Sequence, residues 1–98
     1  MDERWKGPSN FGIYIKRLRE EKGKRLKDVA DKSSINLSYI YRIECGERKV
    51  SSISIDIIVR LSYALEVDAA ELFKEAMMEI EATYNDEGIL IDKALVSK

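Results

Sequence analysis

The chain has 98 residues, of which 45% are hydrophobic and 36% are charged, and its formal net charge is −1. This length fits a single domain with a modest core. One Cys and no His exclude a disulfide framework and the His-bearing arrangements of metal sites and of many catalytic centres.

No apolar run approaches the roughly 20 residues that span a bilayer, and residues 1–6 contain no signal-peptide core. We therefore expect a cytoplasmic protein with no membrane contact, no cofactor and no metal. Its single thiol, Cys45, is expected to be a reduced and inert residue, with a redox sensor as the alternative.

The charge is divided unevenly along the chain. Residues 1–49 hold 13 Lys or Arg against 8 Asp or Glu, a net charge of +5, whereas residues 50–98 hold 4 against 10, a net charge of −6. Binding of a polyanion depends on the field at the docking face, so the basic half favours a DNA-binding surface. The alternative is that mixed charges only solvate the helices.

The N-terminal third predicts an arm followed by two helices. Residues 1–10, with Gly7-Pro8, predict a loose arm. Residues 11–23 predict a helix that Gly23 ends, and residues 24–32 predict a second, shorter helix. The side chains expected to face inward are Phe11, Ile15, Leu18, Val29 and Ala30.

The next segment predicts a capped helix with two different faces. Asn36 is a suitable N-cap, Gly46 suits the left-handed turn that ends a helix, and Ile40 and Ile43 form an apolar stripe. The remaining side chains point outward: Leu37, Ser38, Tyr41 and Arg42. Two short helices across a tight turn constitute a helix-turn-helix.

Two further helices follow. Residues 54–65 are apolar around most of the helix circumference, which predicts the central buried helix. Asp68 and Glu71 have the spacing of a capping box, after which Leu72 and Phe73 are expected to point inward. This fifth helix is predicted to run to about Thr83 before residues 85–88 end it.

The C-terminal part of the chain, from Met77 onward, is unusually apolar for a solvated tail. Met77, Ile80 and Tyr84 share one side of the helix, and a second apolar group follows, made up of Ile89, Leu90, Ile91, Leu95 and Val96. We expect these residues to form a dimer contact. The alternative is that the tail folds back over its own domain.

The whole ordered pattern resembles the Xre or Cro type of helix-turn-helix domain, the family of lambdoid phage repressors and many bacterial and plasmid regulators. The resemblance covers about residues 11–75. It rests on the series Ile15, Leu18, Arg19, Gly23, Val29-Ala30, Ile35, Asn36, Ile40, Ile43, Glu44, Gly46, Ser54, Ile58, Leu61, Ala64-Leu65 and Leu72-Phe73. It implies an all-α fold, a five-helix lambda-repressor-like DNA-binding domain at 11–75, with 76–98 as a C-terminal extension.

The chain also departs from that family at the helix-turn-helix. Arg25 stands where relatives usually have a Ser or Thr cap, which predicts a second helix less stable by about 1 kcal/mol. Leu26 replaces a Gln that bonds a DNA phosphate in relatives. Leu37 stands where relatives commonly hydrogen-bond a base, although a leucine can contact a thymine methyl group.

Arg19 and Glu44 both fall where their helices turn inward, and long charged side chains are seldom buried unless they are paired. The resemblance implies that the two form a salt bridge. We therefore predict a structural ion pair that joins the first helix to the end of the third.

The pattern predicts a sequence-specific DNA-binding regulator, a repressor or controller that acts as a homodimer on double-stranded DNA without catalysing a reaction. Base contacts are expected from Leu37, Ser38, Tyr41 and Arg42. Phosphate contacts are expected from Lys24, Arg25, Lys27, Asn36, Arg48 and Lys49. The alternative is a protein-interaction module, such as an antitoxin or anti-repressor partner, that keeps the fold. A regulatory protein partner is compatible with either.

Overall fold

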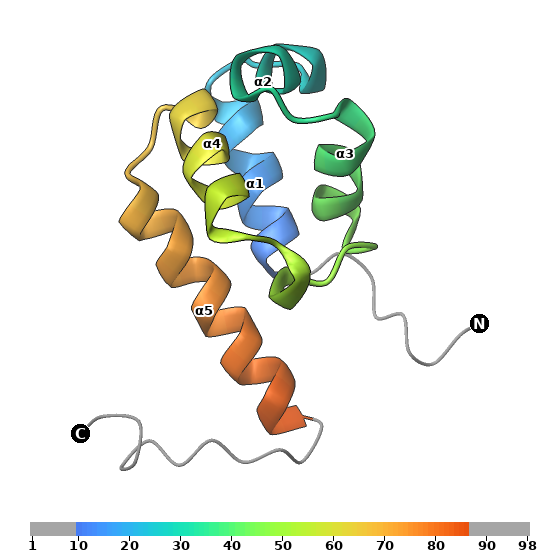
Figure 1. The fold of residues 1–98 in the computed structure, drawn as a ribbon, viewed down its shortest axis with the longest axis vertical. Helices are drawn as coiled ribbons and strands as arrows, with labels where there is room; N and C mark the ends of the chain where they lie inside the picture. Colours follow the sequence, from blue (N-terminus) through green and yellow to red (C-terminus); the bar gives the residue numbers. More distant parts are fainter. Residues whose placement is uncertain (1–9, 87–98) are drawn as a thin grey trace.

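The computed structural model describes residues 10–86, which form five α-helices and one short 3-10 helix (Figure 1). The elements are α1 Asn10–Glu21, α2 Leu26–Ser33, α3 Leu37–Cys45, η1 Val50–Ser52, α4 Ile55–Leu65 and α5 Ala69–Asp86. The all-α, lambda-repressor-like fold that the sequence predicts is confirmed. None of the helices in residues 10–86 is both long enough and apolar enough to cross a membrane.

Local sequence explains where the helices begin and end. Asn36 Oδ1 accepts a hydrogen bond of 2.8 Å from the Ser38 N–H at the start of α3, and Ser54 Oγ accepts one of 3.2 Å from Ile57 at the start of α4. Gly46 ends α3 with a φ of 78°, a left-handed conformation that glycine adopts without steric cost. Helices α3 and α4 are therefore each capped at the start by their own sequence, and α3 is capped at its end as well.

One hydrophobic core holds the helices together, and every helix contributes to it. α2 and α3 lie next to each other across a short turn, α4 packs against α2, and α1 packs against α3 (Figure 1). The largest fully buried side chains are Phe11, Ile15, Val29, Ile40, Ile43, Leu61, Leu65 and Leu72. Burial of side chains of this kind contributes about 1.5–3 kcal/mol each, which is the main stabilising term of the fold.

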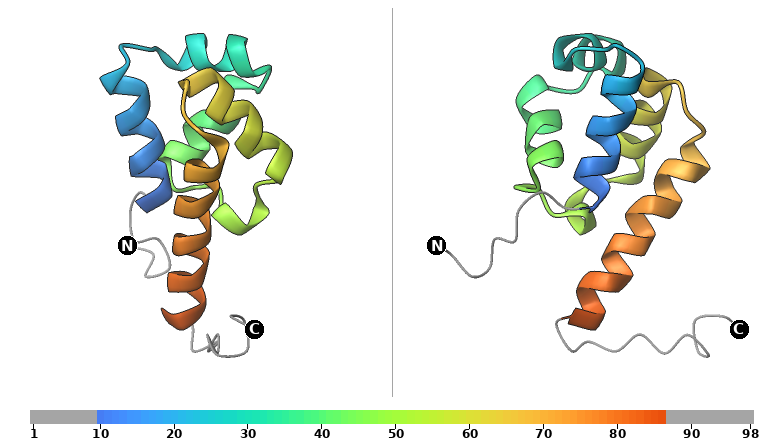
Figure 2. Two further views of the ribbon diagram at one scale, coloured as in Figure 1. Left: turned by 90° about the vertical axis from the view of Figure 1, so that its left-hand side faces the viewer. Right: turned by 180° about the vertical axis from the view of Figure 1, so that it is seen from behind.

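The last turns of helix α5 extend beyond the other four helices. Its C-terminal turns project beyond α1 and α4 in all three views (Figures 1 and 2). Its first half is tied to the domain by Leu72 and Ala76, and Glu79 Oε1 accepts a hydrogen bond of 2.7 Å from the backbone N–H of Phe11. The helix continues to Asp86, about one turn beyond the predicted end at Thr83.

Two predicted core assignments are wrong in detail. Leu72 is buried as predicted, but Phe73 is 38% exposed, because the next helical position lies about 100° further round and faces away from the core. Helix α4 is buried on one side only. Its other side exposes Ile55, Val59 and Tyr63, which are spaced four residues apart.

Candidate nucleic-acid interface

The turn between α2 and α3 fixes the direction of α3. Ser34 adopts a left-handed conformation with a φ of 58°, and Ile35 is buried immediately after it. Asn36 Oδ1 also accepts a hydrogen bond of 2.6 Å from the Ser38 hydroxyl. The cap therefore orients the first polar side chain on the outer face of the helix.

The outer face of α3 carries the four residues that the sequence predicts as base contacts. Leu37 is 42% exposed and Tyr41 is 50% exposed, and Ser38 and Arg42 are exposed as well. A hydrogen bond with the Cys45 side chain, one turn further along, raises the pKa of the Tyr41 phenol. These side chains form one continuous surface of mixed apolar and hydrogen-bonding character.

The inner face of α3 is held by α1. Arg19 and Glu44, predicted to pair, form two hydrogen bonds, from Nε to Oε2 at 2.8 Å and from Nη2 to Oε1 at 3.0 Å. Arg19 Nη1 also donates to the Lys24 carbonyl at 2.9 Å. The hydrogen bond to Glu44 raises the pKa of Arg19. The guanidinium thus joins α1, the start of α2 and the end of α3.

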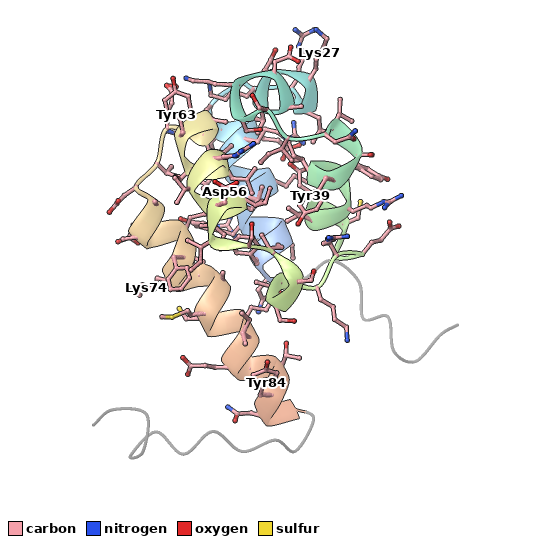
Figure 3. All side chains as sticks on the ribbon, viewed as in Figure 1. Lys27, Tyr39, Asp56, Tyr63, Lys74 and Tyr84 are labelled. Carbon is pink, nitrogen blue, oxygen red and sulfur yellow. The ribbon has the colours of Figure 1, made fainter. Side chains whose placement is uncertain are left out.

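Three of the predicted phosphate contacts are engaged with carboxylates. The ion pairs are Lys24 with Glu66 at 3.4 Å, Arg25 with Asp28 at 3.1 Å and Lys27 with Asp31 at 3.3 Å. Figure 3 shows Lys27 projecting from the outer side of α2. Each local charge is therefore largely offset by its neighbour.

Arg25 also changes the expected capping of α2. Its own side chain cannot accept a hydrogen bond, but the Asp28 carboxylate accepts one of 2.8 Å from the Arg25 backbone N–H. This hydrogen bond is one half of a capping box. The Arg25 guanidinium also donates a hydrogen bond to the same Asp28 carboxylate. The loss of capping predicted from Arg25 is thus offset by Asp28.

Arg48 and Lys49 lie on the other flank of α3, in the turn after Gly46. The N–H groups of Glu47 and Arg48 both bond the Arg42 carbonyl, at 2.9 and 3.2 Å, and fold the chain back along the helix. The Arg48 guanidinium then lies over the Tyr39 ring at 4.5 Å. Tyr39 was not among the predicted site residues, because only this turn brings it to Arg48.

The predicted dimer residues are found partly within the described chain. Met77 is 42% exposed and Tyr84 is 36% exposed, whereas Ile80 packs partly against the core. The remaining residues assigned to this surface lie outside the described residues, namely Ile89, Leu90, Ile91, Leu95 and Val96.

Known proteins share this arrangement. A model of the helix-turn-helix domain family matches residues 10–73. The structure of the restriction-modification controller protein C.AhdI from Aeromonas hydrophila is 33% identical, with a TM-score of 0.58, over 64% of this chain and 91% of that one. The wild-type restriction-modification controller protein C.Esp1396I is 32% identical, with a TM-score of 0.59, over 74% of this chain and 90% of that one.

A third similar structure contains DNA. SinR, described as the master regulator for biofilm formation and solved in complex with DNA, is 32% identical, with a TM-score of 0.58, over 64% of this chain and 97% of that one. No curated protein sequence matches the chain. The family model covers more than half of the chain, and the three structures share its fold with TM-scores of 0.58–0.59. The chain therefore belongs to the helix-turn-helix family, with the Xre/Cro-type fold of DNA-binding transcription regulators.

Proposed function

We propose that the chain is a sequence-specific DNA-binding regulator, a repressor or controller, that acts as a homodimer on an operator with two half-sites. The observation that carries the proposal is the outer face of α3. It exposes one apolar side chain, two side chains with a hydroxyl group and one cationic side chain, and the helix is capped at both ends. A helix of this diameter fits the major groove of B-DNA.

The side chains on that face have distinct roles in the proposal. Arg42 can make a bidentate contact to guanine, the commonest specific contact in the major groove. Leu37 can contact a thymine methyl group, and Ser38 can donate to or accept from either kind of base. Tyr41 lies one turn after Leu37 and extends the same surface.

Phosphate contacts then fix the register of α3 on the duplex. Asn36 lies at the N-terminus of α3, where backbone N–H groups favour an anion, and Arg48 and Lys49 lie beyond its C-terminus. Lys24, Arg25 and Lys27 remain further candidates, although each would exchange a carboxylate partner for a phosphate. Surface ion pairs of this kind contribute only about 0–1 kcal/mol, so the exchange is not costly.

The homodimer follows from the small number of base pairs that one helix-turn-helix can read. Two copies on one face of the duplex bind half-sites about 34 Å apart, which requires a self-complementary surface that leaves the outer face of α3 free. We assign this surface to Met77, Ile80 and Tyr84 of α5, with Ile89, Ile91 and Leu95 beyond it. The exposed stripe Ile55, Val59 and Tyr63 of α4 extends it.

The contacts of the opposite edge of α5 support this position for the dimer surface. Glu71 and Glu75 act on Tyr14 of α1, whose pKa is raised first by burial and then by these two carboxylates. That edge of α5 therefore faces α1. By helical spacing Met77 lies on the other edge, next to α4, which packs against α5 (Figure 1).

Selection of binding sites from random duplexes, followed by sequencing, tests the proposal. The expected result is one enriched sequence with two-fold symmetry and half-sites about one helical turn apart. Enrichment of a single asymmetric half-site would contradict the homodimer while leaving DNA binding intact.

A protein-interaction module is the second candidate, and two observations favour it. Leu37 exposes an apolar side chain at the start of α3, and three nearby cations are held by carboxylates. An antitoxin or anti-repressor partner would use such a surface to bind protein. Absence of DNA binding even at low salt, in the same selection, would favour this candidate.

A further inference from the structure

A groove of about 680 Å³ runs between α1 and α3 and reaches the start of α2. Its inner part is formed by the ion pair of Arg19 with Glu44. The side chains along its sides are Ile13, Lys16, Arg17 and Glu20 from α1, Leu26 from α2, and Tyr41 and Cys45 from α3. Because Tyr41 belongs to both, the groove borders the outer face of α3.

The groove contains two cations that have no carboxylate partner among residues 10–86. Lys16 and Arg17 are exposed, and within residues 10–86 neither forms an ion pair, whereas Lys24, Arg25 and Lys27 each do. Glu20 is the one exposed carboxylate along the groove, since Glu44 is buried against Arg19. The groove therefore carries net positive charge.

The only α2 side chain that lines the groove is apolar. Leu26 occupies that position and offers no side-chain hydrogen-bond donor. Inside the groove, an anion would therefore meet the cations of α1. Long Lys and Arg side chains suit that task, since their apolar stems can lie along Ile13 and Leu26 while their charged ends reach outward.

The dimensions of DNA show which anion would lie here. The major groove is about 12 Å wide and an α-helix with its side chains is about 10–12 Å across, so an inserted α3 has a phosphate backbone on each flank. Arg48 and Lys49 lie on one flank. The groove with Lys16 and Arg17 lies on the other.

We propose that this groove receives one sugar-phosphate strand of the operator, with Lys16 and Arg17 each neutralising a phosphate while Arg48 and Lys49 hold the opposite strand. The inference rests on the proposed function and adds a phosphate-binding surface on α1 to it. The two residues position the duplex and read no bases.

The salt dependence of DNA affinity tests the assignment. Affinities of the full chain for the selected operator and for random duplex DNA are measured from 50 to 300 mM salt. Each phosphate neutralised contributes about 0.9 to the slope of log affinity against log salt. For the Lys16→Gln, Arg17→Gln double variant, the slope of log affinity against log salt is therefore expected to be shallower by about 1.8 on both duplexes.

A matched control removes the same charge elsewhere. Lys22→Gln with Lys74→Gln also lowers the net charge by two, but neither lysine lines the groove. This control is expected to keep the parental slope. Thermal melting of the Lys16, Arg17 variant should match the parent, because both side chains are exposed. The control also loses the exposed 2.9 Å hydrogen bond from Lys22 Nζ to the Glu66 carbonyl, so it should melt at or slightly below the parent.

Each outcome bears on a different part of the proposal. An unchanged slope in the Lys16, Arg17 variant, or an equal change in both double variants, overturns the groove while specific DNA binding stands. A loss confined to the selected operator would make these residues base contacts and also overturn the assignment. If the parent binds no DNA at any salt concentration, the proposed function fails and the groove with it.

Discussion

The carboxylate of Glu44 is held by the guanidinium of Arg19 through two hydrogen bonds, and its side chain is only 4% exposed. The pair links α1 to the last turn of α3. It therefore sets the angle at which the outer face of α3 is presented, although neither residue lies on that face.

Removal of one partner tests this structural role. Glu44→Ala leaves Arg19 charged and largely buried without its partner, which typically costs about 3–5 kcal/mol. Thermal and urea unfolding measure the loss. Glu47→Ala, an exposed carboxylate in the following turn, is the control and is expected to unfold like the parent. A Glu44→Ala variant as stable as the parent would show that water replaces the pair.

The same contact between α1 and α3 depends on a glycine. A Cβ added to Gly12 would overlap the Ile43 carbonyl oxygen and would lie 2.8 Å from that of Glu44, both of them backbone atoms that cannot turn aside. Gly12→Ala should therefore separate the helices and destabilise the fold by about 1–3 kcal/mol. Ile13→Ala, at the exposed neighbouring position, should change stability by no more than about 0.5 kcal/mol. Melting temperatures of the two variants give the comparison.

The fold could be predicted from the sequence because its signals are local. Caps at Asn36 and Ser54, the left-handed turn at Gly46 and the apolar spacing of each helix all depend on a few neighbouring residues. The prediction that Phe73 points inward is wrong. Phe73 follows the buried Leu72, but the domain covers only a narrow stripe of this helix. Spacing alone does not give the width of that stripe.

The site could be predicted less completely, because charge pairing and loop geometry are not local signals. The partner of Lys24 is Glu66, which lies far away in sequence and is brought near only by the fold. The partner of Arg48 is Tyr39, which is reached only because the turn after α3 folds back along the helix. The importance of Lys16 and Arg17 follows from the same fact. They become distinct from Lys24, Arg25 and Lys27 only when the ion pairs of those three residues are known.

Acid should weaken the start of α2 through Asp28. The side chain and backbone of Arg25 hold the pKa of the Asp28 carboxyl below its usual range. A depressed pKa in the folded state means that this interaction stabilises the fold above the unfolded value of about 3.9 and is lost as pH falls through the lowered value. Asp28→Asn should melt below the parent at pH 7, and the difference should shrink towards pH 3. Asp31→Asn, which removes no cap, should show a smaller difference at pH 7.

Arg42 should determine specificity at one base pair in each half-site. A bidentate contact to guanine discriminates by about 1–3 kcal/mol, so Arg42→Ala should lose that much on the preferred operator and little on random duplex DNA. Lys49→Ala should instead weaken binding to both about equally, as expected of a phosphate contact. Affinities of both variants on both duplexes separate the two roles. An equal loss in Arg42→Ala would assign it to phosphate.

The dimer surface can be tested with two adjacent methionines. Met77 lies on the α4 side of α5 and is 42% exposed, whereas Met78 is 54% exposed and lies about 100° further round the helix. A buried, unpaired carboxylate is costly, so Met77→Glu should shift the protein toward monomer in light scattering while Met78→Glu stays dimeric. Binding to a two-half-site operator should weaken in the first variant only.

A chain ended after Asp86 lacks Ile89, Ile91 and Leu95 and is expected to dimerise less tightly than the full chain. If that shortened protein is fully dimeric at low micromolar concentration, the interface is confined to α4 and α5. If Met77→Glu is also dimeric, the assigned surface is wrong.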